Sequence, residues 1–65
     1  MPDTVWIEPE AEIDSGTIIH PFTKICGITR IEKNVEIMSF STIIDSVVEN
    51  GTIIREYTHL EKTFI

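Results

Sequence analysis

Residues 17–43 decide the fold, and in units of six they read TIIHPF TKICGI TRIEKN VEIMSF STI. The third residue of every unit is isoleucine. The step of six, with two steps of five, continues in both directions and meets an aliphatic residue each time. These eleven positions are Ile7, Ile13, Ile19, Ile25, Ile31, Ile37, Ile43, Val48, Ile54, Leu60 and Ile65. Only 18 of the 65 residues are Ile, Val or Leu, so a random order would not fill every position.

The position two residues before each aliphatic is also restricted, because it is always small or β-branched. These residues are Val5, Ala11, Thr17, Thr23, Thr29, Val35, Ser41, Ser46, Thr52, Thr58 and Thr63. Residues two apart on a strand point to the same side, so each unit sends one large and one small side chain inward and then turns. This pattern predicts an all-β parallel β-helix of hexapeptide repeats, with about 18 residues per coil and about three and a half coils.

Stacking by 18 residues sorts the inward aliphatics into three faces. The first face holds Ile7, Ile25, Ile43 and Leu60, the second holds Ile13, Ile31, Val48 and Ile65, and the third holds Ile19, Ile37 and Ile54. Both five-residue steps fall at the corner between the first and second faces, in successive coils. The corner before the third face stacks Gly16, Asn34 and Gly51, which tolerate positive φ, and we expect left-handed backbone there.

Two other folds fit the sequence less well. An amphipathic helix would place apolar residues three and four apart, and the strict six-residue step excludes it. An antiparallel barrel would show two-residue alternation and several hairpin turns, whereas only Asn50-Gly51 resembles one. Of the 65 residues, 25 are β-branched, which also favours strands over helices.

Charge and composition restrict the function. The formal charge is −6 and the pI is about 4.6, so we expect neither nucleic acid nor an anionic membrane as a partner. No apolar run approaches the roughly 18 residues of a membrane span, and no signal peptide is recognisable. Cys26 is the single cysteine, which excludes an internal disulfide and, with two histidines, a structural zinc site. A cytoplasmic location is expected.

From residue 4 to residue 65 the chain resembles the opening coils of the β-helix in the family of bifunctional N-acetylglucosamine-1-phosphate uridyltransferase/glucosamine-1-phosphate acetyltransferases. The resemblance rests on WIE at 6–8, GTIIHP at 16–21, TKICGIT at 23–29, IIDSVV at 43–48 and GTIIR at 51–55. It implies a left-handed coil, although parallel crossovers are right-handed in almost all folds. Where the family often has glycine after the inward aliphatic, this chain has Asp14, Glu32 and Glu49.

The resemblance also implies that both active sites of the full-length family lie outside these residues. We therefore expect residues 1–65 to be a single domain, a truncated part of a longer β-helix, with no catalytic and no metal-binding residue. Acetyl-CoA and Mg²⁺ are implied for the full-length enzymes and not for this chain. The expected role is an oligomerising scaffold. The alternatives are a small hexapeptide acyltransferase or nucleotidyltransferase with sites between subunits, and a stand-alone assembly module.

The reactive side chains have ordinary structural explanations. We interpret His20 and His59 as solvated corner residues too far apart to cooperate as a base or as metal ligands. Cys26 has no histidine or lysine beside it in its column and is interpreted as a structural thiol. The stacked acids Asp14, Glu32 and Glu49 fit a solubilising edge better than a cation site.

Outward apolar residues carry the functional prediction. Phe22, Phe40 and Tyr57 are spaced by 18 and 17 residues and should stack as one column along a corner. Other outward apolar residues are Met38, Ile44, Ile18, Ile53, Val47 and Phe64. Soluble monomers rarely expose apolar stripes of this kind. We predict a homotrimer whose interface contains Phe22, Phe40, Tyr57, Met38 and Ile44; the alternative is packing of the column within one chain.

Overall fold

The computed structural model of the chain describes residues 5–65, so residues 1–4 of the predicted domain lie outside the described part. Ten short strands account for all the regular structure of this part. They are β1 (Val5–Ile7), β2 (Glu12–Ile13), β3 (Ile18–Ile19), β4 (Thr23–Cys26), β5 (Arg30–Ile31), β6 (Glu36–Ile37), β7 (Thr42–Ile44), β8 (Val47–Val48), β9 (Ile53–Ile54) and β10 (His59–Glu61). Between residues 5 and 65 there is no helix that could cross a membrane.

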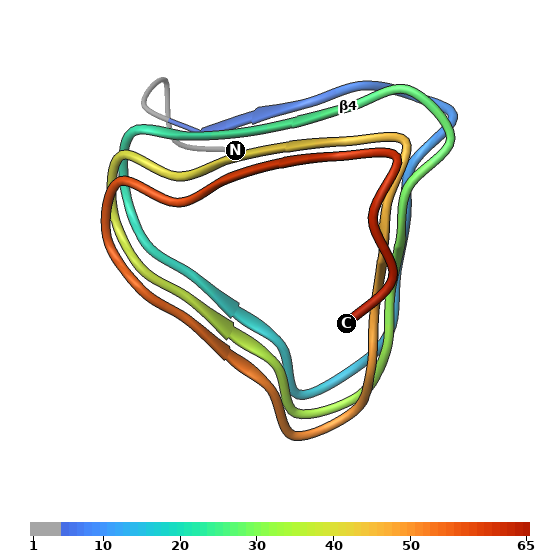
Figure 1. The fold of residues 1–65 in the computed structure, drawn as a ribbon. Coiled ribbons are helices and arrows are strands. Elements are labelled where there is room, and N and C mark those ends of the chain that lie inside the picture. The colour runs from blue at the N-terminus through green and yellow to red at the C-terminus, as the bar shows by residue number, and fades with distance from the viewer. Residues whose placement is uncertain (1–4) are drawn as a thin grey trace.

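Three parallel sheets correspond one to one with the three predicted faces. The first face is β1-β4-β7-β10, the second is β2-β5-β8 and the third is β3-β6-β9. The register pairs Ile25 with Ile7 on one side and with Ile43 on the other, so the six-residue step is a true spatial repeat. Seen along its axis the chain traces a triangle with one sheet on each side (Figure 1). The predicted parallel β-helix is confirmed.

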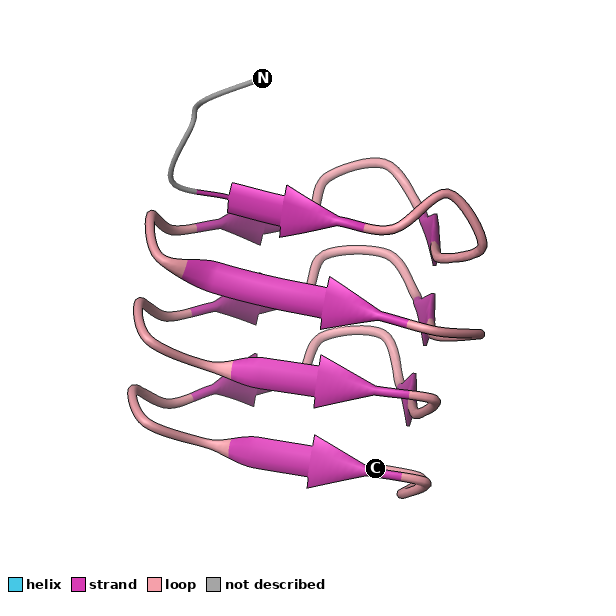
Figure 2. Cartoon of the chain, turned by 90° about the horizontal axis from the view of Figure 1, so that it is seen from above, coloured by secondary structure: helices cyan, strands magenta, loops and turns pink. Residues whose placement is uncertain are grey.

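The coil is left-handed. In Figure 1 the chain runs clockwise from its blue N-terminal coil to its red C-terminal coil. Figure 2 shows the same coils from above, in order from the N-terminus to the C-terminus, with the C-terminal coil on the side that faces the viewer of Figure 1. Clockwise travel toward the viewer defines a left-handed coil, as the resemblance implied.

The core is a narrow column of the predicted inward side chains. Ile25, Ile31, Ile37, Ile43 and Val48 are fully buried, and Ile7, Ile13 and Ile19 pack against them from the N-terminal coil. Ile65 differs from the prediction, because it is 39% exposed: no described coil covers its outer edge. Burial of a fully enclosed isoleucine stabilises the fold by about 1.5–3 kcal/mol, so the middle coils hold most of the core.

The small inward side chains are polar, and their hydroxyls bond to the backbone. Thr23 Oγ1 donates to the carbonyl of His20 at 2.8 Å, and Thr29 Oγ1 donates to the carbonyl of Cys26 at 2.8 Å. Within residues 5–65, no buried polar side-chain atom lacks a hydrogen-bond partner. Threonine and serine can therefore fill the tight corners of the core without the cost of an unpaired buried group.

Positive φ angles close every corner. The predicted Gly16, Asn34 and Gly51 have φ of 77°, 59° and 79°, which confirms the left-handed corner before the third face. The corner after the first face uses Gly27, Asp45 and Lys62. The corner between the third and first faces uses Phe22, Phe40 and Tyr57, with φ of 62–64°. Bulky residues rarely adopt this conformation, and the sequence did not predict it here.

Candidate functional site

The most unusual surface feature is the aromatic column, formed by Phe22, Phe40 and Tyr57. Adjacent ring centroids are 5.3 and 5.4 Å apart, and the rings are parallel to within 4° and 6°. Such pairs contribute about 0.5–1.5 kcal/mol each beyond burial, which offsets part of the roughly 1–2 kcal/mol that each left-handed residue costs. The predicted column is confirmed. Its rings nevertheless remain 51–78% exposed, so stacking within the chain covers their faces and leaves their edges in solvent.

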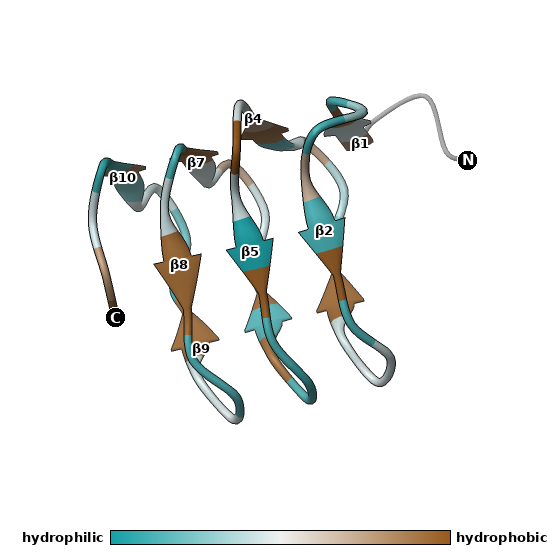
Figure 3. Ribbon diagram, turned by 90° about the vertical axis from the view of Figure 1, so that its right-hand side faces the viewer, coloured by the Kyte–Doolittle hydropathy of each residue, from teal (hydrophilic) through white to brown (hydrophobic). Residues whose placement is uncertain are grey.

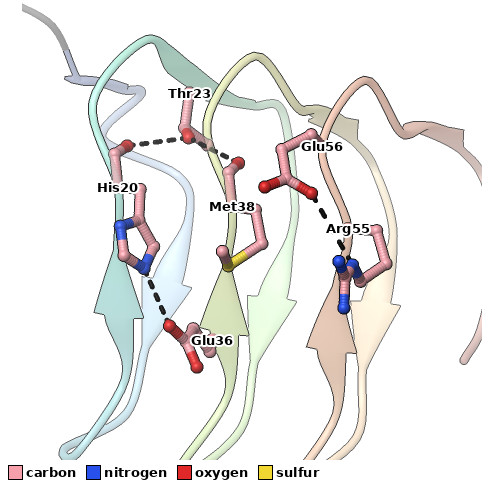
Figure 4. A network of polar contacts seen from close by, with 6 residues as sticks. All are labelled: His20, Thr23, Glu36, Met38, Arg55 and Glu56. Atoms are coloured by element: carbon pink, nitrogen blue, oxygen red, sulfur yellow. Dashed lines mark hydrogen bonds and ion pairs between the residues drawn. The ribbon is translucent and has the colours of Figure 1, made fainter.

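Polar contacts tie the coils together beside the column (Figure 4). Thr23 Oγ1 donates both to the carbonyl of His20 in its own coil and, at 3.3 Å, to the carbonyl of Met38 in the next. His20 Nε2 lies 2.8 Å from Glu36 Oε2, one coil further on. Arg55 Nε and Glu56 Oε1 are 3.6 Å apart. The pairing of His20 with Glu36 was not predicted.

Met38 and Ile44, the other two predicted interface residues, lie at different edges of the molecule. Met38 is half-buried and stands two residues before Phe40, beside the aromatic column. Ile44 is also half-buried, but it ends β7 at the far edge of the first face, in register with Cys26 and Glu61. The structure therefore groups Met38 with the aromatic column and separates Ile44 from it.

The acids at the corners bond to neighbouring coils. Asp14 Oδ2 accepts from Arg30 Nη2 at 2.8 Å, and Glu32 Oε1 accepts from the backbone N–H of Asn50 at 3.3 Å. Around Gly27, Glu8 Oε1 accepts from its N–H at 2.9 Å, and Asp45 Oδ1 accepts from the next N–H, of Ile28, at 2.8 Å. These carboxylates satisfy turn backbone that no strand partner reaches.

The remaining reactive groups are scattered. Cys26 is a free, half-buried thiol at the end of β4. His59 is exposed and lies 3.7 Å from Glu61, away from His20. The described residues form no pocket and no group of three His, Cys, Asp or Glu side chains suited to a metal. Their arrangement does not fit acetyl-CoA or Mg²⁺.

The left-handed coil, the three parallel sheets and the six-residue period define a β-helix of hexapeptide repeats. Within that class, the chain is similar to a segment of the enzyme named bifunctional protein GlmU, which confirms the resemblance to the bifunctional uridyltransferase/acetyltransferase family. It is 43% identical over 49 residues to the protein of Fervidobacterium nodosum. It is 42% identical over 50 residues to that of Caldanaerobacter subterraneus subsp. tengcongensis, and 39% over 57 residues to that of Corynebacterium diphtheriae.

These alignments cover 75%, 77% and 86% of the chain. They span only 11–12% of the length of the relatives. No family model matches the sequence, and no solved structure matches it significantly. The comparisons therefore concern one segment of a much longer protein.

Proposed function

We propose that this chain is a β-helix segment of a transferase of UDP-N-acetylglucosamine biosynthesis, acting in the cytoplasm as an oligomerising scaffold and not as a catalyst. The observation that carries the proposal is the similarity to bifunctional protein GlmU over at least 75% of the chain, in three relatives. The fold supports it, because the matched residues form the repeating coil itself.

The scaffold role is supported by the exposed apolar surface. Three half-exposed aromatic rings stand in one rigid column, and Met38 lies beside them. Soluble monomers rarely leave such a stripe uncovered. We propose a homotrimer in which Phe22, Phe40 and Tyr57 contact neighbouring copies, together with Met38 and, at the far edge of the first face, Ile44.

The absence of a catalytic role is supported by the contacts of the reactive groups. His20 is engaged with Glu36 on the next coil, and Asp14 is engaged with Arg30. Glu8 and Asp45 hold turn backbone. Acetyl-CoA and Mg²⁺ would then be bound by parts of the full-length protein other than these residues. Neither nucleic acid nor a membrane is proposed as a partner.

An acetyl-transfer assay tests this proposal. Purified chain is incubated with acetyl-CoA and glucosamine-1-phosphate, and N-acetylglucosamine-1-phosphate is detected by mass spectrometry, because a thiol reagent would also react with Cys26. A full-length enzyme of the resembled family is the positive control. We expect no product above the rate without protein. Turnover by the chain would overturn the scaffold role in favour of a small acyltransferase with sites between subunits.

A further inference from the structure

Charge is distributed unevenly around the coil. One side consists of residues 18–24, 36–42 and 53–59 together with Trp6, and we call it the apolar side. It carries two acids and two bases, so its formal charge is zero with neutral histidines. The other described residues form the acidic side, with eight acids and three bases, a formal charge of −5. The eight acids are Glu8, Glu10, Glu12, Asp14, Glu32, Asp45, Glu49 and Glu61.

The exposed apolar side chains are distributed in the opposite way. Six of the nine exposed large hydrophobic residues lie on the apolar side, including the whole aromatic column. They are Trp6, Ile18, Phe22, Phe40, Ile53 and Tyr57. Figure 3 looks onto the second face, which belongs to the acidic side, and hydrophilic colour marks the outward part of β2 and β5 there. Exposed hydrophobic surface and low charge therefore coincide on one side of the coil.

We infer that in the proposed trimer the apolar side of each copy faces the other copies and the acidic side faces solvent. This inference rests on the proposed function and specifies its interface. Chains with a charge of −6 repel one another, and only contact through the neutral side removes apolar surface from water without bringing acids together. In the opposite arrangement, three acidic sides would be desolvated against each other.

A closed ring of three copies needs two different surfaces on each copy, because each contact joins unlike patches. The apolar side supplies them on either side of the aromatic column. The outward row of the third face reads Ile18, Glu36, Ile53. The outward row of the first face begins with Trp6 and Lys24, and its four described positions include no acid.

The two rows complement each other across a contact between copies. One offers a carboxylate between two isoleucines, and the other offers an ammonium next to an indole. Among the described residues Glu36 contacts His20 through Oε2, which leaves Oε1 for Lys24 of a neighbouring copy. Because the aromatic column lies between the two rows, it comes nearest the three-fold axis. Ile44, at the far edge of the first face, lies outside the centre of this interface.

Matched charge insertions test the inference. Ile53→Glu and Ile28→Glu each replace an exposed isoleucine by glutamate, on the apolar and on the acidic side respectively; the two are 58% and 79% exposed. Sedimentation equilibrium should show association weakened by at least about 30-fold in Ile53→Glu, as for a central interface residue. Ile28→Glu should remain trimeric, and Ile53→Thr, which keeps the β-branch without the charge, should be closer to wild type than Ile53→Glu.

The single tryptophan gives a second readout that needs no variant. Trp6 is 58% exposed in one chain, so its emission should shift to shorter wavelength and resist acrylamide quenching as the trimer forms on concentration. A trimer with solvent-exposed Trp6, or one dissociated by Ile28→Glu and not by Ile53→Glu, overturns this inference and leaves the proposed scaffold intact. A monomeric wild type overturns both.

Discussion

The corner at Gly27 offers the sharpest test of how the coils are stacked. Gly27 has φ of +69°, and a Cβ added to it would collide with Asp45 Oδ1 in the next coil. That oxygen accepts the hydrogen bond of Ile28 N–H at 2.8 Å. Gly27→Ala must therefore adopt a strained backbone and also displace a carboxylate that holds the turn. Gly51 is the matched control, because its φ is +79° and a Cβ added there would have nothing within 4 Å.

The two substitutions should differ by the value of one displaced hydrogen bond. Left-handed backbone costs alanine about 1–2 kcal/mol, and this is the whole expected effect of Gly51→Ala. Loss of a hydrogen bond to a charged group adds about 1.5–3 kcal/mol, and the lower value applies because water can reach the Ile28 amide. We expect Gly27→Ala to lower the free energy of unfolding by about 3 kcal/mol in total.

Urea denaturation followed by circular dichroism, at one fixed protein concentration, measures these differences. Repeating Gly27→Ala in an Asp45→Gly background isolates the collision, since glycine fits the φ of +48° at position 45. There the substitution should cost no more than Gly51→Ala does. Equal costs for Gly27→Ala and Gly51→Ala, or an unchanged cost of Gly27→Ala without the Asp45 side chain, would refute the stacking of these two corners.

Three further predictions concern the core and the column. Ile25→Asp and Ile37→Asp each bury an unpaired charge at a cost of several kcal/mol, so far-UV circular dichroism should show no folded chain; a native spectrum would contradict the inward assignment. Phe40→Ala removes two ring stacks, about 1–3 kcal/mol, and Phe22→Ala removes one; equal urea midpoints would argue against a continuous column. Thr23→Val keeps the shape but deletes a buried hydroxyl, and should cost about 1 kcal/mol in the same assay.

Periodicity predicted the parts of the structure that depend on coil length alone. Once each coil has 17 or 18 residues, stacking fixes which side chains are inward, and it also fixes that Phe22 lies over Phe40 and Tyr57. The hand of the coil is different, because the same inward pattern suits either hand, and only the family resemblance indicated it. The left-handed φ of the aromatic residues was missed because turn preferences favour glycine and asparagine at such positions.

Side-chain contacts across coils were also beyond the sequence. Stacking places His20 and Glu36 on neighbouring coils, but their bond depends on rotamers that spacing does not specify. The same holds for Asp45, which periodicity placed at a solvated corner without indicating that its carboxylate accepts from turn backbone. The uneven distribution of charge could have been read from the sequence, since the three ranges of the apolar side contain only Glu36 and Glu56 as acids.

The coil is proposed above all to hold copies of itself together. Sedimentation equilibrium of the purified 65-residue chain at micromolar concentration tests this most directly, with circular dichroism on the same sample to verify the fold. We predict a mass of three times the 7.4 kDa of one chain. A folded species with the mass of a single chain would contradict it.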